Sequence, residues 1–413
     1  MTAARLVARC VRGLEQAVAA EILQPGLSTV TRLGHREVHF HTLLAGPGAS
    51  RPATADDVFL LAARGRDIGP ARDGLPGLAD LAAEADLEAL IRSRRRYGGS
   101  GPVTGVEVSA SFLGGRNFNR HDAEDAVGRV LAHRLGVGYH SRRGGLAPPA
   151  GHTGWRLTLD GARATLMLRI ADRPLHRRAY KRFSLAGTLH PPVAAAMARM
   201  ADLRPGLTVL DPCCGAGTLL IEAAAQQPQA LLRGFDLSPD AVRATRENAG
   251  ALAVTAGRAD AGRLPLPDGG ADRVLCNPPW GGQVTAGGLL ASSPERWWAE
   301  LRRVLAPGGT AVLLLPGAGD IATGIRWGLV PAQVQRVRVS GAQPFIARFT
   351  APGRPERRST APARTERPGR AEAGLQAGPV APGRTERPSL PSGRPEPRPT
   401  PPARTERPKA AGR

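Results

Sequence analysis

The 413-residue sequence predicts an α/β protein in which residues 203–350 form a doubly wound parallel sheet. Two observations predict this fold. Short apolar runs alternate with segments of helical apolar spacing, which is typical of a parallel sheet covered by helices on both faces. A glycine-rich turn, "DPCCGAGT", directly follows the first apolar run, and in such sheets this is where ligands bind.

The elements of this region follow in order along the chain. The expected strands are 207–211, 231–236, 271–276 and 310–316, and the expected helices are 219–227, 239–252 and 294–309. Ser238 is a suitable N-cap in front of Pro239, and Gly308 closes the third helix. The final segment, "VQRVRVSGAQPFIARFT", reads as two strands, which we expect to form an antiparallel hairpin at the sheet edge.

Residues 1–175 predict a mixed α+β region. Residues 5–23 read as a strand and then a helix, and an alternating strand at 105–115 precedes an amphipathic helix at 120–136. The Asp160-Gly161 pair is a strong turn signal and predicts a hairpin over 154–172. Residues 45–105 are rich in Gly, Pro and Arg and receive no assignment.

Residues 351–413 predict a disordered basic tail. The pentapeptide "RTERP" recurs there every 20 residues, at Arg364, Arg384 and Arg404, without the apolar residues that a packed core needs. Of the formal net charge of +21, the tail carries +8, so that residues 1–350 carry +13. This excess favours nucleic acid as a partner, although a GC-rich genome would also enrich Arg.

The cysteines and the chain start favour a cytoplasmic protein without a metal site or a membrane span. Cys10, Cys213, Cys214 and Cys276 form no CxxC pair and have no His at metal-binding spacing, and adjacent Cys213 and Cys214 are poor disulfide partners. The N-terminal residues carry charges throughout, and no run approaches the length of about 18 apolar residues that a membrane helix needs.

Three acids at successive strand ends predict a nucleotide-type cofactor site. Asp211 with Gly215 and Gly217 gives D-x-x-x-G-x-G, but Leu220 stands where the dinucleotide fingerprint needs a third glycine. The spacing suits S-adenosylmethionine, because a carboxylate can hold its ammonium and the turn amides its carboxylate. Asp236 is placed for the ribose hydroxyls and Asp260 for the adenine amine; each acid taken singly could be an ordinary loop residue.

The stretch "VLCNPPWGG" predicts the substrate site. Asn277 supplies a side-chain carbonyl, and Pro278 is held extended by Pro279, so its backbone carbonyl has a fixed direction. Two such acceptors can bind both hydrogens of an exocyclic amine and turn its lone pair toward a methyl donor. Trp280 offers a face on which a flipped base can stack. Alternatively, the prolines end a strand and Trp280 packs in the core.

These motifs resemble those of class I amino-methyltransferases. The stretches "RGLEQAVAAEI", "FLGGRNFNRHDAEDAVGRVL" and "RPLHRRAYKR" narrow the likeness to the THUMP-domain RNA guanosine-N2 methyltransferases, over residues 5–350. The resemblance implies a ferredoxin-like segment at 1–60, a THUMP domain at 61–175, a linker helix at 176–202 and a Rossmann-like seven-stranded methyltransferase domain at 203–350. It also implies that the THUMP domain grips the acceptor end of tRNA.

The matching positions imply the site residues. Asn277, Pro278 and Trp280 correspond to the catalytic motif; the cofactor shell comprises Asp211, Cys213, Gly215, Gly217, Thr218, Asp236, Leu237, Asp260 and Ala261; and the RNA contacts are Arg116, Asn117 and Arg120. A solvated basic face is an equally good interpretation of any one of these RNA contacts.

The sequence therefore predicts a tRNA guanosine-N2 methyltransferase that uses S-adenosylmethionine. Three alternatives remain open: an rRNA enzyme of the same chemistry, an adenine-N6 enzyme with the same Asn-Pro-Pro, and a non-catalytic RNA-binding factor with this fold. The presence of all three cofactor acids and of Asn277 argues against the last.

Overall fold

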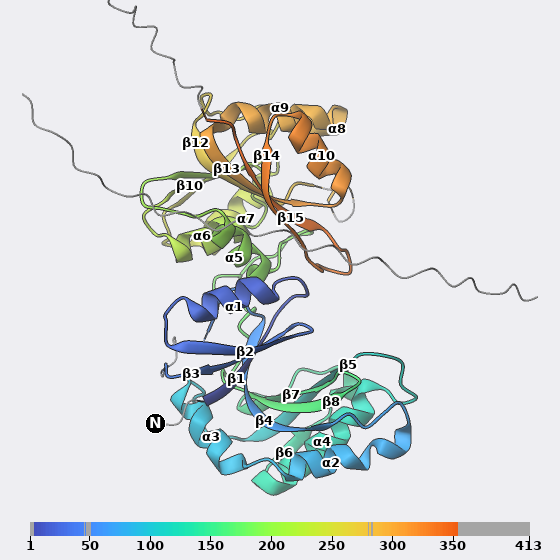
Figure 1. Cartoon of the computed structure of the whole chain (residues 1–413). Coiled ribbons are helices and arrows are strands. Elements are labelled where there is room, and N and C mark those ends of the chain that lie inside the picture. Colours follow the sequence, from blue (N-terminus) through green and yellow to red (C-terminus); the bar gives the residue numbers. More distant parts are fainter. Residues whose placement is uncertain (1–3, 45, 47–50, 280, 282–283, 354–413) are drawn as a thin grey trace, which may run out of the picture. The chain divides into compact units, whose positions relative to one another are not determined.

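The computed structural model describes residues 4–44, 46, 51–279, 281 and 284–353. In this part of the chain the named strands form two sheets, one of eight strands and one of seven, which Figure 1 shows with their helices. The predicted tail lies outside the described residues from position 354 onward.

The eight-stranded sheet is built from the N-terminal region and has the strand order β2-β3-β1-β4-β8-β7-β5-β6. Its strands are β1 (Ala4–Arg9), β2 (Ser28–Gly34), β3 (Glu37–Thr42), β4 (Asp57–Arg66), β5 (Gly105–Phe112), β6 (Gly138–His140), β7 (His152–Leu159) and β8 (Arg163–Arg169). The helices among them are α1 (Glu15–Leu23), α2 (Pro76–Ala83), α3 (Leu87–Arg96) and α4 (Arg120–Leu135), with short 3₁₀ turns at Arg72–Gly74 and Arg142–Gly144. The predicted hairpin is present as the antiparallel pair β7 and β8.

Strand β4 makes this sheet continuous. It pairs with β1 on one side and with β8 on the other, both antiparallel. The predicted domain boundary between residues 60 and 61 falls inside β4, so the chain does not divide there. The sequence did not indicate this strand because it lies in the Gly-, Pro- and Arg-rich stretch that received no assignment.

The two faces of this sheet differ in chemistry. On one face, apolar side chains such as Val108 and Leu157 join a large core that includes Leu78 of α2 and Leu131 of α4. On the other face the apolar cluster is small and consists of Val7, Phe59 and Met167 with Leu61 packed against it. Strands alternate their side chains between faces, so the charged residues next to this small cluster lie on the face away from α2 and α4.

The seven-stranded sheet has the order β11-β10-β9-β12-β13-β15-β14. Its strands are β9 (Thr208–Asp211), β10 (Leu231–Asp236), β11 (Val254–Arg258), β12 (Ala271–Cys276), β13 (Leu305–Leu315), β14 (Val330–Arg336) and β15 (Phe345–Thr350). Five strands are parallel, and β14 and β15 form the antiparallel hairpin at the edge. The predicted doubly wound α/β fold is confirmed.

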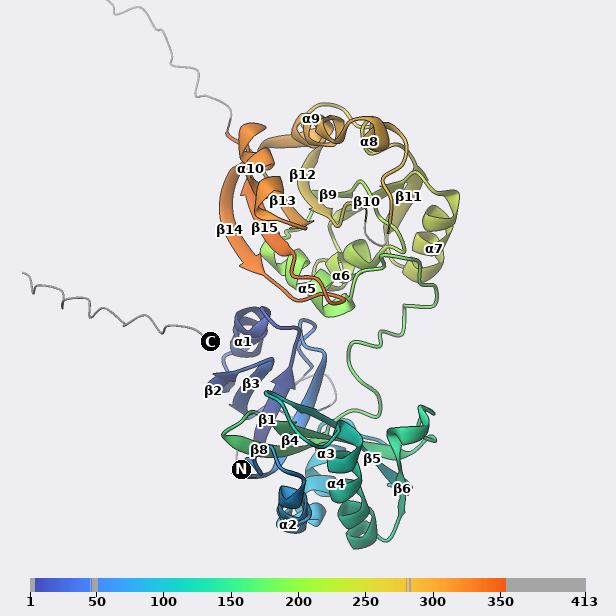
Figure 2. The same cartoon turned by 90° about the vertical axis from the view of Figure 1, so that its right-hand side faces the viewer.

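Helices cover both faces of the seven-stranded sheet (Figure 2). They are α5 (Pro191–Met200), α6 (Thr218–Gln226), α7 (Pro239–Ala249), α8 (Leu289–Ser292), α9 (Pro294–Val304) and α10 (Ala318–Arg326). Leu275 of β12 faces the core that contains α5 and α6, whereas its neighbour Val274 faces the core that contains α9. Trp297 and Trp298 of α9 are both buried in that second core.

Two predicted helices differ from those observed. The segment 176–190 contains no helix, and only α5 forms within the predicted linker helix of 176–202; Pro191 and Pro192 fit its first turn, where the amide is not needed. Helix α9 ends at Val304, and the next residues already belong to β13, so Gly308 lies beyond the helix end.

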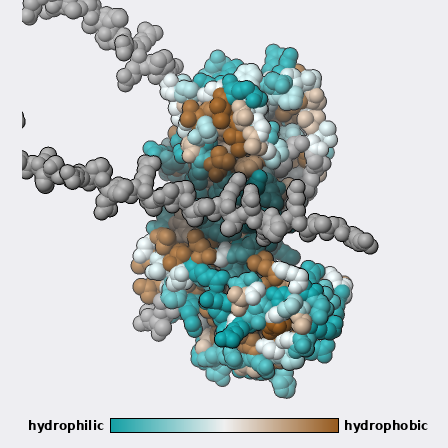
Figure 3. Space-filling view, turned by 45° about the vertical axis from the view of Figure 1, so that its right-hand side comes forward, coloured by the Kyte–Doolittle hydropathy of each residue, from teal (hydrophilic) through white to brown (hydrophobic). Residues whose placement is uncertain are grey.

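The exposed surface is mainly hydrophilic on the face shown in Figure 3, with separate hydrophobic patches. Exposed large apolar residues include Leu27 and Leu33 of the N-terminal region and Val330 and Val334 of β14. Among the helices of the described residues, none has the length and apolar character to cross a membrane.

Candidate active site

The glycine-rich turn between β9 and α6 has the geometry of a ligand cradle. Gly215 and Gly217 have φ of +53° and +80°, a region that favours glycine, and Gly217 forms the N-cap of α6. A Cβ on Gly217 would lie 2.9 Å from Thr245 Cγ2, so this position has no room for a side chain. The Thr245 hydroxyl in turn donates a 2.8 Å hydrogen bond to the Gly215 carbonyl and holds the turn in place.

Asp211 ends β9 and is almost completely buried, with 1% of its surface exposed. Its Oδ1 accepts a hydrogen bond from the Cys213 amide at 3.1 Å, and it forms no ion pair among the described residues. Burial raises the pKa of the Asp211 carboxyl to about 8; the Cys213 amide opposes this shift and the nearby charge of Asp236 adds to it. A cation bound beside this carboxyl would favour its ionised form.

Asp236 ends β10 and connects the turn to the next helix. Its Oδ2 accepts a hydrogen bond from the Gly215 amide at 2.9 Å, and its Oδ1 accepts one from the Ser238 amide at 2.9 Å. A carboxylate has about four acceptor positions, so both oxygens keep capacity for further donors. Ser238 also caps α7 as predicted, accepting a hydrogen bond from the Ala241 amide.

Asp260 lies two residues beyond β11. Its Oδ1 accepts a hydrogen bond from the Gly262 amide and its Oδ2 one from the Leu289 amide, at 2.9 and 2.8 Å. A Cβ on Gly288 would meet Asp260 Oδ2, so glycine is required for this close approach. The carboxylate therefore fixes the start of α8 as well as facing the cavity.

One cavity of about 890 Å³ brings these groups together. The predicted residues that line it are Asp211, Cys213, Gly215, Thr218, Asp236, Leu237, Asp260, Ala261, Asn277 and Pro278. Gly217 is absent from this lining and acts through the turn geometry. Trp280 lies outside the described residues. A volume of this size is in the range of small-molecule and cofactor sites.

Asn277 follows β12 and its amide has a defined orientation. Nδ2 donates to the Gly187 carbonyl at 3.3 Å, which directs the amide nitrogen toward the linker. Among the described residues no donor binds the Asn277 side-chain oxygen, so this oxygen is available to a ligand in the cavity. Pro278 and Pro279 follow it along the same wall.

Two wall segments of the cavity carried no signal in the sequence interpretation. One is the linker segment 185–189, and the other is the connection after β14, with Val339, Ser340 and Ala342. Asn248 of α7 ties the linker down, because its Oδ1 accepts from the Phe183 amide and its Nδ2 donates to the Ala216 carbonyl. Gly187, with φ of +73° inside "SLAGTLHPP", was the available local signal.

The predicted RNA contacts near α4 divide into two kinds. Arg116 has a side chain only 4% exposed, and both of its Nη atoms bind the Asp67 carboxylate, at 2.5 and 2.7 Å. Burial alone raises the pKa of Asp67, but the hydrogen bonds from Arg116 and two backbone amides outweigh it, and this pKa lies below its ordinary value. This pairing favours a structural role for Arg116, and its contact with the RNA backbone stays a prediction.

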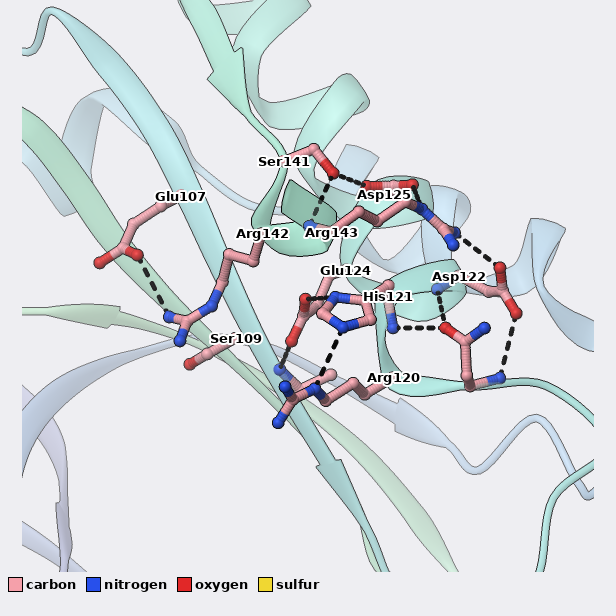
Figure 4. Close-up of polar contacts among 12 residues, drawn as sticks. Glu107, Ser109, Arg120, His121, Asp122, Glu124, Asp125, Ser141, Arg142 and Arg143 are labelled. Atoms are coloured by element: carbon pink, nitrogen blue, oxygen red, sulfur yellow. Dashed lines mark hydrogen bonds and ion pairs between the residues drawn. The ribbon is translucent and has the colours of Figure 1, made fainter. Parts of the chain in front are cut away.

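Asn117 and Arg120 are exposed. At the start of α4, Asn119 and Asp122 form a capping box. Arg143 binds both Asp122 and Asp125, as Figure 4 shows. Arg120 Nε lies 3.4 Å from His121 Nε2, and His121 in turn binds Glu124. The guanidinium of Arg120 has no carboxylate partner among the described residues and remains available to an anion.

The described part of the chain holds no cluster of three or more potential metal ligands. All four cysteines are free, and Cys276, at the end of β12, is buried, which raises its pKa well above the ordinary value.

The proteins that this chain is similar to are methyltransferases. Residues 178–342 match the family described as RMKL-like, methyltransferase domain. The chain is 35% identical over 214 residues to a tRNA (guanine(6)-N2)-methyltransferase of Thermus thermophilus, an alignment that covers 50% of this chain and 61% of that protein. It is 31% identical over 179 residues to the U6 snRNA (guanine-N(2))-methyltransferase THUMPD2 of Homo sapiens, covering 40% of this chain and 34% of that protein.

A solved structure extends the likeness along the chain. The crystal structure of TrmN from Thermus thermophilus superposes with a TM-score of 0.66 and 28% identity, covering 84% of this chain and 99% of that one. By sequence alone, the aligned segment spans less than two thirds of the length of the curated relatives.

Proposed function

We propose that this protein, whose residues 178–342 match the family described as RMKL-like, methyltransferase domain, transfers a methyl group from S-adenosylmethionine to the exocyclic N2 amine of a guanosine in tRNA. One observation carries the proposal: Asn277 and Pro278 line the same cavity as Asp211, Asp236 and Asp260. A site for a planar amine therefore opens directly onto a site for a nucleoside with an ammonium group.

The residues present fit this cofactor. Asp211 is a buried carboxyl without an ion-pair partner among the described residues. Burial disfavours its negative charge, and a bound ammonium would supply the positive counter-charge that stabilises it. In the turn before α6 the amides of Cys213, Gly215 and Gly217 already donate within the protein, so the first amides of α6 itself, from Thr218 onward, are the groups that suit the carboxylate of the cofactor. Asp236 and Asp260 take the ribose hydroxyls and the adenine amine, while Cys213, Thr218, Leu237 and Ala261 form the walls.

The chemistry needs alignment of the amine more than a strong base. The bound cofactor supplies an electrophilic methyl group on a sulfonium. The Asn277 oxygen and the Pro278 carbonyl accept the two amine hydrogens, which turns the nitrogen lone pair out of the ring plane. These two dipoles also stabilise the positive charge that develops on the nitrogen during transfer. The bond from Asn277 Nδ2 to Gly187 preorganises the first acceptor.

The substrate assignment rests on the relatives and on charge. The relatives named above act on guanine N2 in tRNA and in U6 snRNA, and TrmN is similar along almost its whole chain. The net charge of +21 suits a polyanionic substrate. We assign exposed Asn117 and Arg120 to contacts with the acceptor end of tRNA, and Trp280 to stacking with the flipped base.

The test is methyl transfer to defined RNA. The protein is incubated with labelled cofactor and unmodified total RNA, and the product nucleosides are identified by mass spectrometry. We expect N2-methylguanosine in the tRNA fraction. Methylation found only on adenosine, or only in rRNA, would refute the proposal.

Two substitutions at Asn277 examine the mechanism. Asn277→Ala removes an acceptor that acts on the reacting amine, and kcat should fall on the order of 10²-fold with unchanged cofactor affinity. Asn277→Asp keeps an acceptor oxygen but loses the donor to the Gly187 carbonyl, so its kcat should lie between those of the wild type and of Asn277→Ala. A matched control is Gln333→Ala on exposed β14, which should keep full activity.

A further inference from the structure

A second cavity, of about 510 Å³, lies on the charged face of the eight-stranded sheet and is rich in arginine. The register defines this face, because Arg9 pairs with Asp57, Arg156 with Met167, and Phe59 with Arg169. Residues opposite each other in adjacent strands project to the same side. The cavity is therefore built on a continuous row of side chains from β1, β4, β8, β7 and β5.

The cavity contains more positive than negative charge. Six arginines line it, and the lining acids are two aspartates; the arginines are Arg9, Arg12, Arg36, Arg156, Arg169 and Arg338. Both aspartates are engaged, Asp57 with Arg169 at 2.6 Å and Asp56 with His190 at 2.7 Å and with Arg36 at 3.5 Å. Arg9 is paired with Glu37 from outside the lining, also at 2.6 Å. Excess positive charge remains after these pairs are formed.

Three of the lining arginines, Arg12, Arg156 and Arg338, form no ion pair among the described residues, and Arg156 of β7 is the one that lies within a strand of the sheet. Its Nη1 and Nη2 donate to two neutral hydroxyls, Ser109 Oγ at 3.2 Å and Ser111 Oγ at 2.5 Å. Its Nε is buried and has no hydrogen-bond partner among the described residues. Burial lowers the pKa of Arg156 to about 9; Arg9 and Arg36 add to the shift and Glu37 and Glu124 oppose it, so Arg156 is still a cation at neutral pH. A buried cation without a counter-ion is costly in the free protein.

The second cavity is a neighbour of the active-site cavity. Val339 and Ser340 line both of them, and the linker contributes 185–189 to the first and His190 to the second. A chain bound with one unit in the first cavity can therefore continue past the second. Arginine clusters with a preoriented guanidinium bind phosphate well, because its planar fork matches the phosphate oxygens.

From these observations we propose that the second cavity binds a backbone phosphate of the substrate RNA, with Arg156 as its central ligand and Ser109 and Ser111 orienting the guanidinium. This inference rests on the proposed function in that the occupant is RNA. It adds a specific anchor, remote from the reacting base, that positions the backbone beside the active site. Ser109, on β5, is labelled in Figure 4.

The experiment measures RNA binding without cofactor, so its outcome is independent of which nucleoside is methylated. Binding of unmodified tRNA is measured by filter binding between 50 and 200 mM salt for wild type, Arg156→Gln and the control Arg92→Gln, an exposed arginine of α3. Arg156→Gln should weaken binding about tenfold at the lowest salt, and the slope of log affinity against log salt should decrease by about one. Arg92→Gln should match wild type.

Stability distinguishes a binding role from a structural one. Removing an uncompensated buried charge should leave the Tm of Arg156→Gln equal to or above that of wild type, whereas loss of a structural arginine lowers it. Inorganic phosphate, at constant ionic strength, should raise the Tm of wild type and not that of Arg156→Gln. Arg156→Lys keeps the positive charge and should keep the wild-type slope of log affinity against log salt. This variant can be measured even if Arg156→Gln does not fold.

Three results would overturn the proposal. The first is equal tRNA affinity and salt slope in wild type and Arg156→Gln. The second is a Tm loss in folded Arg156→Gln that accounts for its weaker binding. The third is stabilisation by inorganic phosphate together with unchanged tRNA binding in the Gln variant, since this would identify a site for a free anion.

Discussion

With the cofactor placed as proposed, the buried carboxyl of Asp211 should make cofactor binding depend on pH. Its pKa of about 8 means that only about a tenth of the free protein carries an ionised Asp211 at pH 7, and about a hundredth at pH 6. Binding of an ammonium requires the ionised form, so the apparent dissociation constant rises as that fraction falls. We expect cofactor affinity to decrease about tenfold, or about 1.4 kcal/mol, from pH 7 to pH 6.

Proton linkage explains why the cofactor affinity should decrease as the pH is lowered. The folded pKa lies above the ordinary value of 3.8, so the free folded state holds an extra proton between about pH 4 and 8. The contribution of Asp211 to the stability of the free protein is therefore greatest at low pH, where the carboxyl is protonated in both the folded and the unfolded states. This contribution is lost as the pH rises toward 8, because ionisation of the buried carboxyl is unfavourable. Bound ammonium lowers the pKa again, so binding near pH 7 releases close to one proton.

Calorimetry with S-adenosylhomocysteine, which carries the same amino-acid group, measures both quantities. Titrations at pH 6 and 7, each in two buffers of different ionisation enthalpy, give the affinity and the number of protons released. Asp211→Asn should bind more weakly at pH 7 and lose this pH dependence. Asp202→Asn, which removes an exposed carboxylate, should retain it. Constant wild-type affinity across this range, without proton release, would refute the reasoning.

Two further predictions concern stability. Arg116→Ala breaks an ion pair whose side chains are 4% and 3% exposed and leaves the Asp67 carboxylate with two backbone amide donors but no counter-charge. Urea unfolding should therefore show a loss of about 3 kcal/mol. Arg120→Ala, at an exposed position, should change the free energy of unfolding by less than about 0.5 kcal/mol, and a similar loss in both variants would contradict the structural role of Arg116. Gly217→Ala combines a positive φ with a blocked side-chain position and should cost about 2–3 kcal/mol and weaken cofactor binding. Gly136→Ala, with a positive φ but open space, should cost only about 1 kcal/mol; equal Tm shifts of the two variants would show that the contact is unimportant.

Local patterns determined the fold of residues 203–350, the seven-stranded α/β region. The alternation of apolar runs with helical spacing, the glycine turn and the acids at successive strand ends lie within short windows of sequence. Each pattern depends on near neighbours in the chain, so its structural consequence is set locally. The sheet order then follows from the general rules for parallel α/β folds, which place Asp211, Asp236 and Asp260 at one sheet edge.

Tertiary structure decided how the N-terminal region uses its charges. Arg116 finds Asp67, which is 49 residues away, and Arg156 finds two serines 45 and 47 residues away. No local period encodes these contacts, because they depend on which strands pair and in what register. The same is true of the linker wall at 185–189, which lines the cavity next to a segment that Asn248 holds in place. The sequence alone determined that the protein is basic; the fold decided which cations are neutralised internally and which are left to bind a ligand.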